Sequence, residues 1–394
     1  MKRKDISVVG NLSPGIVQDL SDKEREIIRV AQELDARFLP QFERKEFTYH
    51  YAADRMKSYL PEGLHDDANL VKDQRVQISY NVWSARNNPE EAETIICLGG
   101  IYNSARRFDF FAETAAENFN VIALDYPGKG HSGNLRMPHD YTLSTYAAIV
   151  EELIRNEAPE KFHILGHSHG AKVIYTMAEE GFSDPRWKST IIGDMPPETP
   201  AAPKLRRAWR NRERPFYETI EESVRKLESF LQGHGAPVQK DFVIHDFNHG
   251  FAHFTREGFG WAYDPGSMTG YADEYLLPYD KWDAYKALPT PILILAGEKS
   301  NTATPETVQR MLQDRPDASL LVYEGVGHYP EIVTPRRIKE VTGWIENAGK
   351  SAPLRAIVPA DPDKGVLLEI KQDNNPPAAQ KPRRRRQTPG GEIR

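Results

Sequence analysis

The sequence predicts an α/β fold, in which a mostly parallel sheet is covered by helices on both faces. Short apolar runs of the length of buried strands recur along the chain, and segments with helical spacing of apolar residues separate them. Because a parallel sheet is buried on both faces, its strands are expected to be near-continuous apolar runs of this kind. The expected strands are Val76–Trp83, Thr94–Leu98, Val121–Leu124, Phe162–Leu165, Thr190–Ile192, Pro291–Leu295 and Ser319–Val322.

Helical segments are expected between these strands and before them. The core helices are predicted at Phe108–Asn118, Thr142–Arg155 and Ala171–Glu180. Near the N-terminus, Ser21–Glu24 has the form of a capping box, in which a serine and a glutamate each satisfy an amide of the first helical turn. Apolar residues then recur at helical spacing as far as Phe38. We therefore expect an N-terminal helical extension that packs on the core.

The alternation of strands and helices stops between Pro196 and about Leu288, where the chain is rich in arginine, glutamate, histidine and aromatic residues. Within this stretch, Glu218–Leu231 has a helical pattern. We interpret the stretch as a helical cap inserted between two strands of the sheet. The expected organisation is an N-terminal helical extension (1–70), a core in two parts (71–195 and 289–350), the cap (196–288) and a tail (351–394).

Length, composition and charge indicate the size of the folded core and the kinds of partner to expect. The chain has 394 residues, of which 39% are hydrophobic, and this permits a folded core of about 250–300 residues. The net charge of −6 gives no reason to expect nucleic-acid binding by the core. The single cysteine, Cys97, lies in an apolar run and is expected in the core. No apolar run reaches the length of about 18 residues that a membrane span needs, and the charged N-terminus lacks a signal peptide, so we expect a cytoplasmic protein.

The tail (351–394) is rich in proline, aspartate, asparagine and lysine, and it contains the basic run Lys381–Arg386. Such a composition buries no core, so the tail is expected to be disordered. The basic run is interpreted as solvated, with nucleic acid, a membrane or an import receptor as the alternative partners.

The pentapeptide Gly166–Gly170 matches the pattern G-x-S-x-G, with Ser168 at its centre. It follows an expected strand and precedes an expected helix, which is the setting of a nucleophile elbow. A serine at such a turn has a strained backbone, and the two glycines make room for it. The pattern predicts that the Ser168 hydroxyl is a nucleophile.

From about residue 75 to 348 the chain resembles the cap-bearing α/β-hydrolases. The resemblance implies an α/β-hydrolase fold and a serine hydrolase. Two departures from the family pattern are Gly99, where a histidine is usual, and Asn301, where an acid is usual. The motifs that carry the resemblance occur in the family's order and are Gly99–Phe108, Asp125–Ser132, Gly166–Gly170, Asp194–Glu198, Gly297–Asn301 and Gly325–Pro330.

A serine nucleophile needs a base, and the base needs a group that orients it. The resemblance implies that His328, which follows the last strand in a glycine-flanked loop, is this base. The acid is less clear, because Asn301 carries no charge and can only orient a neutral imidazole. Asp194, which follows the strand after the elbow helix, is the favoured acid, and the alternatives are Glu298 or a site without an acid.

The resemblance also implies an oxyanion hole made by the backbone N–H groups of Ile101 and His169. Gly100, Tyr102, His167 and Trp261 are expected to line the substrate pocket. The aromatic residues of the cap predict an apolar or aromatic small-molecule substrate, if the cap folds over Ser168.

Histidines at 245, 249 and 253 recur at intervals of four, which is the spacing of metal ligands on one helix face. The glycine at 250 interrupts that helix, so a cap interior lined by histidine and phenylalanine is the preferred interpretation. We expect no metal and no cofactor.

Three functional hypotheses follow. The first is hydrolysis of an ester, thioester or lactone through an acyl-enzyme on Ser168, with cleavage of a C–C bond as a close variant. The second is a cofactor-free, ring-cleaving dioxygenase. Such proteins share this fold, have an elbow stretch that His167–Gly170 resembles, and keep their acid after the same strand as Asp194. The third is a ligand-binding protein without turnover, which the presence of Asn301 motivates.

Overall fold

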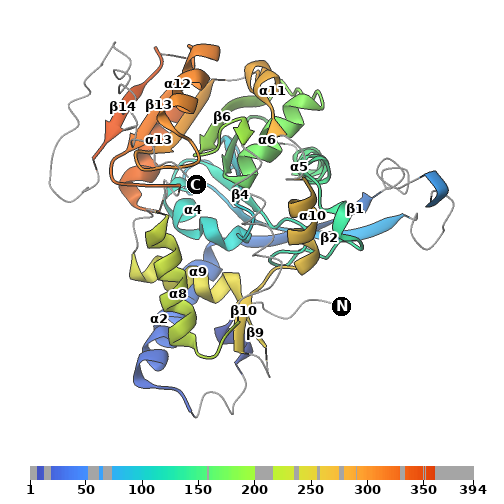
Figure 1. Cartoon of the computed structure of the whole chain (residues 1–394). Helices are drawn as coiled ribbons and strands as arrows, with labels where there is room; N and C mark the ends of the chain where they lie inside the picture. Colours follow the sequence, from blue (N-terminus) through green and yellow to red (C-terminus); the bar gives the residue numbers. More distant parts are fainter. Residues whose placement is uncertain are drawn as a thin grey trace, which may run out of the picture.

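The computed structural model describes residues 7–12, 19–51, 62–64, 73–157, 159–199, 216–234, 239–254, 258–274, 279–289, 291–328, 333–348, 350 and 352–359 (Figure 1). Its central feature is a nine-stranded sheet in the order β1-β2-β4-β3-β5-β6-β12-β13-β14. All neighbours pair in parallel except that β2 is antiparallel to both β1 and β4. The strands are β1 (Glu43–Tyr51), β2 (Gln74–Trp83), β3 (Thr94–Leu98), β4 (Asn120–Leu124), β5 (Phe162–His167), β6 (Trp187–Gly193), β12 (Ile292–Gly297), β13 (Ser319–Tyr323) and β14 (Arg355–Val358).

Helices cover both faces of the sheet, as the sequence predicts. One apolar layer contains residues of α5, α6, α11 and α12, and the other contains residues of α4 and α13. Cys97 is fully buried in the second layer, which confirms its expected place in the core. The bounds of these helices are α4 (Asp109–Ala115), α5 (Leu143–Glu157), α6 (His169–Glu179), α11 (Trp282–Ala287), α12 (Pro305–Asp314) and α13 (Pro335–Asn347).

The N-terminal segment contains the predicted helix, α2 (Asp22–Phe38), and its capping box between Ser21 and Glu24 is present. The apolar face of α2 packs against α8 (Ile220–Gly233) and α9 (Lys240–Gly250) in a shared core cluster. The segment also holds strand β1, which the sequence analysis did not predict. Because most side chains of β1 are exposed or half-buried, the strand lacks the apolar run on which the prediction of strands rests.

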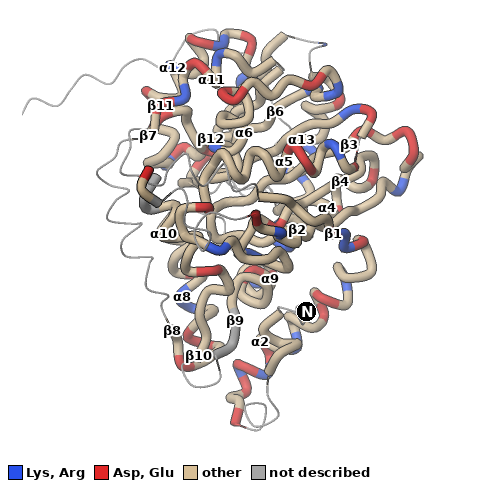
Figure 2. Tube along the Cα trace, turned by 90° about the vertical axis from the view of Figure 1, so that its right-hand side faces the viewer, with Lys and Arg blue, Asp and Glu red and all other residues tan. Residues whose placement is uncertain are grey.

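The stretch interpreted as a cap is a mixture of helices and short strands. With α2, the elements α8, α9, β9 and β10 lie together on one side of the large sheet in both views (Figures 1 and 2). Strands β8, β10 and β9 form a three-stranded sheet of their own. The remaining bounds are β7 (Glu198–Thr199), β8 (Phe216–Tyr217), β9 (Phe251–Phe254), β10 (Gly258–Trp261), α10 (Pro265–Glu274) and β11 (Tyr279–Asp280).

The large sheet extends into the first residues of the predicted tail, where Arg355–Val358 forms strand β14 and pairs in parallel with β13. These residues are therefore ordered, in contrast to the expectation for the tail. Residues 360–394, including the basic run Lys381–Arg386, lie outside the described residues. Among the helices that the structure describes, none combines the length and the hydropathy required to cross a bilayer.

Candidate active site

Ser168 lies at the sharp turn between β5 and α6, with a positive φ of 53° and a ψ of −109°. The two glycines of the motif permit this turn by close approach. A Cβ atom on Gly170 would lie 2.1 Å from the carbonyl oxygen of Leu98, and one on Gly166 would lie 2.7 Å from the amide nitrogen of Ala171. A side chain at either position would therefore push the elbow away from the sheet.

His328 lies in the loop after β13, where it meets Ser168. Its Nε2 atom is 3.0 Å from Ser168 Oγ, a hydrogen-bond distance. The histidine is 6% exposed, so water competes little for this contact. The geometry is that of a base poised to take a hydroxyl proton.

Asp194 contacts the other nitrogen of this imidazole. His328 Nδ1 lies 2.8 Å from Asp194 Oδ2. Asp194 is fully buried and directly follows β6, with a positive φ of 48°. Its Oδ1 accepts a hydrogen bond of 3.0 Å from the backbone N–H of Gly297, and its Oδ2 accepts one of 2.5 Å from the Ser300 hydroxyl. The buried carboxylate thus has hydrogen-bond partners on both oxygens.

The two alternative acids lie elsewhere. Asn301 is exposed, and its side-chain oxygen accepts a hydrogen bond of 3.5 Å from the Thr302 hydroxyl. Glu298 is exposed as well, and its Oε2 accepts a hydrogen bond of 2.8 Å from the backbone N–H of Gly325. Neither side chain is among the partners found for the His328 imidazole in the described part of the chain. The sequence analysis did not single out Ser300, although this residue belongs to the motif that ends at Asn301.

The amides expected to form an oxyanion hole are available. The Gly100 N–H donates to Asn103 Oδ1 at 3.0 Å, and the Asn103 N–H returns a hydrogen bond to the Gly100 carbonyl at 3.0 Å. This turn leaves the next amide, that of Ile101, without an acceptor among the described residues. The amide of His169, in the first turn of α6, has no acceptor among them either, as is usual at a helix N-terminus.

The residues expected to line the pocket come together in two pairs. A Cβ atom on Gly100 would lie 3.7 Å from His167 Nδ1. The ring centroids of Tyr102 and Trp261 are 5.4 Å apart, so the loop after β3 meets strand β10. Ile101 packs in the same small apolar cluster as Tyr263 and Met268.

His167 is next to the base. Its Nε2 lies 3.3 Å from the backbone oxygen of His328. The surrounding protein excludes solvent and lowers the pKa of His167 to about 3, and the neighbouring His328 imidazole adds to this effect. His167 is therefore neutral at physiological pH. Its ring N–H donates a hydrogen bond to the His328 carbonyl oxygen, and the ring contributes no charge to this site.

Asp35 and the histidines at 245 and 249 form a second buried cluster, where α2, the core and α9 meet. Their ligand atoms lie close enough together to hold a metal ion. Most of these groups are already paired: His249 Nε2 lies 2.8 Å and Arg106 Nη2 lies 3.1 Å from Asp35 Oδ1, and His245 Nε2 lies 3.1 Å from Asp109 Oδ2. His245 Nδ1 is buried without a hydrogen-bond partner among the described residues. The arginine already supplies the positive charge that these carboxylates require, so the cluster is that of an ion-pair network. The side chain at position 253, the third histidine of the sequence pattern, lies outside the described residues.

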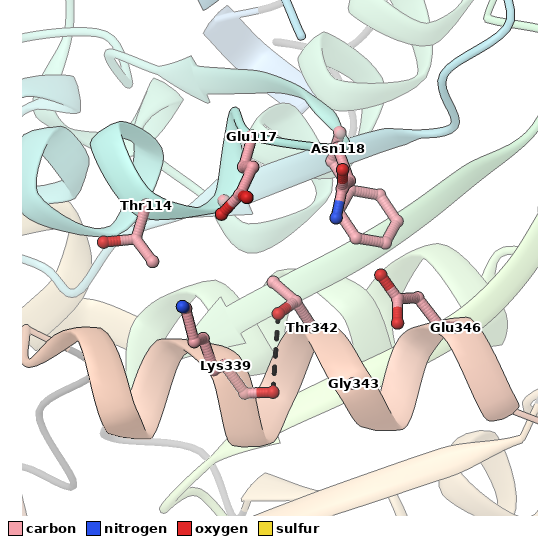
Figure 3. Close-up of a pocket in the computed structure, with 9 residues that line it drawn as sticks. Thr114, Glu117, Asn118, Lys339, Thr342, Gly343 and Glu346 are labelled. Carbon is pink, nitrogen blue, oxygen red and sulfur yellow. Dashed lines mark hydrogen bonds between the residues drawn. The ribbon is translucent and has the colours of Figure 1, made fainter. Parts of the chain in front are cut away.

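A pocket away from Ser168 lies between the C-terminal end of α4 with the residues that follow it and helix α13 (Figure 3). None of the residues discussed for the elbow and its partners lines it. Its polar side chains face one another across the two helices, and we assign it no role in the chemistry of Ser168. The lining residues are Thr114, Ala115, Glu117, Asn118, Phe119, Lys339, Thr342, Gly343 and Glu346.

With this geometry established, comparison with known proteins identifies the family. A family model described as the alpha/beta hydrolase family matches residues 95–341. The chain belongs to the alpha/beta hydrolase family. The predicted α/β-hydrolase fold is thereby confirmed.

Similar proteins are named as hydrolases. The 3-hydroxybutyrate-oligomer hydrolase of Cupriavidus necator is 24% identical over 292 residues, which cover 71% of this chain and 92% of that protein. The 2-(acetamidomethylene)succinate hydrolase of Mesorhizobium japonicum is 26% identical over 280 residues, which cover 68% of this chain and 92% of that protein. These relatives support a hydrolase.

Solved structures share the fold. An alpha/beta hydrolase from Novosphingobium aromaticivorans has a TM-score of 0.62 at 19% identity, covering 78% of this chain and 98% of that one. The structure of an E-2-(acetamidomethylene)succinate hydrolase has a TM-score of 0.57 at 20% identity, and the match covers 77% of this chain and 100% of that one.

Proposed function

We propose that this protein is a serine hydrolase that cleaves an ester, a thioester or a lactone through an acyl-enzyme on Ser168. His328 acts as the base and Asp194 as the acid that orients it. The proposal rests on a continuous chain of two hydrogen bonds. Ser168 Oγ lies 3.0 Å from His328 Nε2, and His328 Nδ1 lies 2.8 Å from Asp194 Oδ2. The relatives that hydrolyse a 3-hydroxybutyrate oligomer and 2-(acetamidomethylene)succinate support it.

The reaction proceeds in two halves. As Ser168 Oγ attacks the substrate carbonyl carbon, its proton moves to His328 Nε2, and the buried Asp194 carboxylate stabilises the imidazolium. The carbonyl oxygen becomes an oxyanion that accepts hydrogen bonds from the amides of Ile101 and His169. His328 then gives the proton to the leaving group, and the acyl group remains on Ser168. In the second half, His328 takes a proton from water, whose oxygen attacks the acyl carbon. His328 then returns this proton to Ser168 Oγ as the acid is released, which restores the free enzyme.

The substrate is expected to reach Ser168 beside Gly100 and His167 on the core and beside Tyr102 and Trp261, where core and cap meet. A pocket with aromatic walls suits an apolar or aromatic acyl group. The same constellation on Ser168 would serve a hydrolase of C–C bonds, and substrate screening distinguishes this variant from ester hydrolysis.

The test is to trap the acyl-enzyme. Rapid mixing with 4-nitrophenyl acetate is expected to give a burst of nitrophenol equal to the enzyme concentration. A peptide containing Ser168 should then carry the mass of one acetyl group. The variant Ser168→Ala should show neither effect and should lose at least about a thousandfold of the turnover. Folded wild-type protein that gives no burst and no acetyl-peptide would refute the mechanism, and oxygen uptake with a hydroxyquinolone would then favour the dioxygenase hypothesis.

A further inference from the structure

Lys129 and His169, the residue that follows Ser168 in the chain, form a buried polar cluster around two shared tyrosine rings. Lys129 lies in the loop after β4 and is 2% exposed, and His169 follows the nucleophile and is 1% exposed. Both contact the same two aromatic rings. Lys129 Nζ lies 5.8 and 5.7 Å from the ring centroids of Tyr126 and Tyr146, and the ring centroid of His169 lies 5.8 and 5.2 Å from them. Two tyrosines therefore join the lysine to the elbow.

The polar atoms of this cluster have no partner in the described part of the protein. Lys129 Nζ and both ring nitrogens of His169 are buried without a hydrogen bond. A buried polar group without a partner costs folding free energy, and an unpaired buried ammonium is rare because its cost is larger still. Such groups call for a partner from outside the chain, such as a bound water, an ion or a ligand.

The carboxylates nearest to Lys129 are already engaged with other donors. Asp125 accepts two backbone N–H groups, at 2.6 and 2.9 Å. Asp264 accepts one backbone N–H at 2.9 Å and a tyrosine hydroxyl at 2.5 Å. Both carboxylates influence Lys129 through their charge, but neither forms a hydrogen bond with its ammonium group. Among the residues that the structure describes, none provides Lys129 with a hydrogen-bonded counter-ion.

A second lysine adds positive charge on the other side of His169. Lys172, one turn along α6 from the nucleophile, is 2% exposed. Its Nζ lies 4.4 Å from the ring centroid of Tyr279 and 5.7 Å from that of Tyr271. The Tyr271 ring, from cap helix α10, lies 5.5 Å from the His169 ring. Core and cap together enclose the cluster.

We propose that Lys129 and His169 bind a carboxylate of the substrate, so that the enzyme acts on an ester, thioester or lactone that carries an acid group. This inference rests on the proposed function, because it treats the bound carboxylate as part of the substrate that Ser168 attacks. His169 links the two sites, since its backbone amide is assigned to the oxyanion hole and its ring belongs to the cluster. The bound carboxylate accepts hydrogen bonds from the Lys129 ammonium and from the N–H of the neutral His169 ring. The aromatic walls accommodate the apolar part of the substrate, and the cluster holds its charged end.

The protonation of the cluster depends on whether it is occupied. Burial lowers the pKa of Lys129 to about 7, against the charges of Asp264 and Asp125, which raise it. Burial also lowers the pKa of His169, and the charges of Lys129 and Lys172 act in the same direction. A bound carboxylate raises the pKa of Lys129, so binding near pH 7 takes up a proton. Above this pH the empty site loses its charge, and its affinity for a carboxylate falls.

Binding is measured first, because it does not depend on turnover. The probe is monomethyl glutarate, titrated calorimetrically into the variant Ser168→Ala. Adding Lys129→Met is expected to weaken binding about 10- to 100-fold, as is usual when a charged hydrogen-bond partner is lost. Adding Lys226→Met, which removes an exposed lysine on α8, is the matched control and should leave the affinity unchanged. Equal affinity with and without Lys129, or no binding by Ser168→Ala at all, overturns the proposal.

A second measurement needs no variant at position 129, so it stands even if Lys129→Met fails to fold. Titrations of Ser168→Ala in buffers of different ionisation enthalpy should reveal net proton uptake at pH 7. The affinity should fall as the pH rises from about 6 to 9. Binding without proton uptake and with no pH dependence contradicts the assignment to Lys129.

The kinetic comparison separates this proposal from the proposed function. We expect the wild-type enzyme to have a higher kcat/KM for mono-4-nitrophenyl glutarate than for 4-nitrophenyl valerate, and Lys129→Met to reduce the ratio about 10- to 100-fold. If neither ester is cleaved but the probe binds through Lys129, the hydrolase proposal fails and the carboxylate site stands. If both esters are cleaved with equal kcat/KM values, the hydrolase proposal stands and the carboxylate site fails.

Discussion

The Ser300 hydroxyl donates a hydrogen bond of 2.5 Å to Asp194 Oδ2, the same oxygen that lies 2.8 Å from His328 Nδ1. Ser300 Oγ in turn accepts the backbone N–H groups of Thr302 and Ala303, at 3.0 and 3.1 Å. The loop after β12, in which Asn301 stands where the family resemblance led us to expect an acid, therefore contributes a hydroxyl to the carboxylate that follows β6. On this account the loop supports the acid instead of supplying it.

We predict that Asp194→Asn lowers kcat by about 10³- to 10⁴-fold, because an amide does not stabilise the imidazolium and favours the wrong tautomer of His328. Ester turnover by purified, folded variants is the measurement. The matched control is Asn301→Asp, which places a carboxylate on an exposed side chain and should leave kcat within a factor of about three. A large gain of activity in Asn301→Asp, or a large loss in Glu298→Gln but not in Asp194→Asn, would move the acid to the other loop.

We predict that Ser300→Ala lowers kcat/KM by about tenfold, the usual effect of removing one hydrogen bond to a charged group. The loss should be much smaller than that of Asp194→Asn, since the Gly297 amide still binds the carboxylate. Thr302→Ala removes a hydroxyl from the same loop without touching Asp194, and it should keep nearly full activity. An unchanged rate in Ser300→Ala would show that the Gly297 amide alone holds the carboxylate.

Acid is expected to destabilise the contact between α2 and α9, where His249 meets Asp35. Burial lowers the pKa of His249 to about 4, the charge of Arg106 acts in the same direction, and the hydrogen bond with Asp35 opposes it. The unfolded chain takes up this proton below about pH 6.5, whereas the folded protein does so only near its lower pKa. Stability is therefore lost as the pH falls from about 6.5 to 4, by roughly 3 kcal/mol for this group.

The measurement is the free energy of unfolding in urea as a function of pH. His249→Gln keeps a hydrogen-bonding group without a titrating one, so its stability should fall less steeply over this range than that of the wild type. His50→Gln, a change at an exposed residue of β1, should retain the wild-type slope. Equal slopes in all three proteins would refute the role given to His249.

Two glycines should respond to alanine in opposite ways. Gly170→Ala places a Cβ atom 2.1 Å from the backbone oxygen of Leu98, which forces the elbow apart and should destabilise the fold by about 3 kcal/mol or more. Gly343→Ala lies in α13, where a Cβ atom meets nothing within 4 Å, and should stabilise it by about 0.5–1 kcal/mol. Urea unfolding of both variants tests the pair, and a harmless Gly170→Ala would mean that the elbow is looser than its contacts indicate.

The sequence was sufficient to predict the central strands, because each is buried on both faces and is therefore an apolar run. Thr94–Leu98 was predicted with the bounds that the structure has. The edge strand β1 escaped prediction because its stability comes from its ladder with β2 and not from an apolar pattern. The capping box at Ser21 was visible because it is a local interaction between residues three apart.

The partners of Ser168 were harder to predict. Asp194, Glu298 and Asn301 all follow strands that end at the same edge of the sheet, and only the conformation of two loops decides which of them meets His328. Lys129 and His169 are far apart in the sequence, and the strand order β4-β3-β5 brings their loops together. No local sequence pattern predicts such a contact. Lys172, four residues after Ser168, is the one feature near the elbow that could have suggested a positively charged group there.

The measurement that tests the central claim most directly is labelling of the folded protein with a fluorophosphonate probe, followed by peptide mass spectrometry. Our account predicts one probe per chain, attached to Ser168, with labelling lost in Ser168→Ala and strongly slowed in His328→Gln. Folded protein that remains unlabelled, or that carries the probe on another residue, would contradict the assignment of Ser168 as an activated nucleophile.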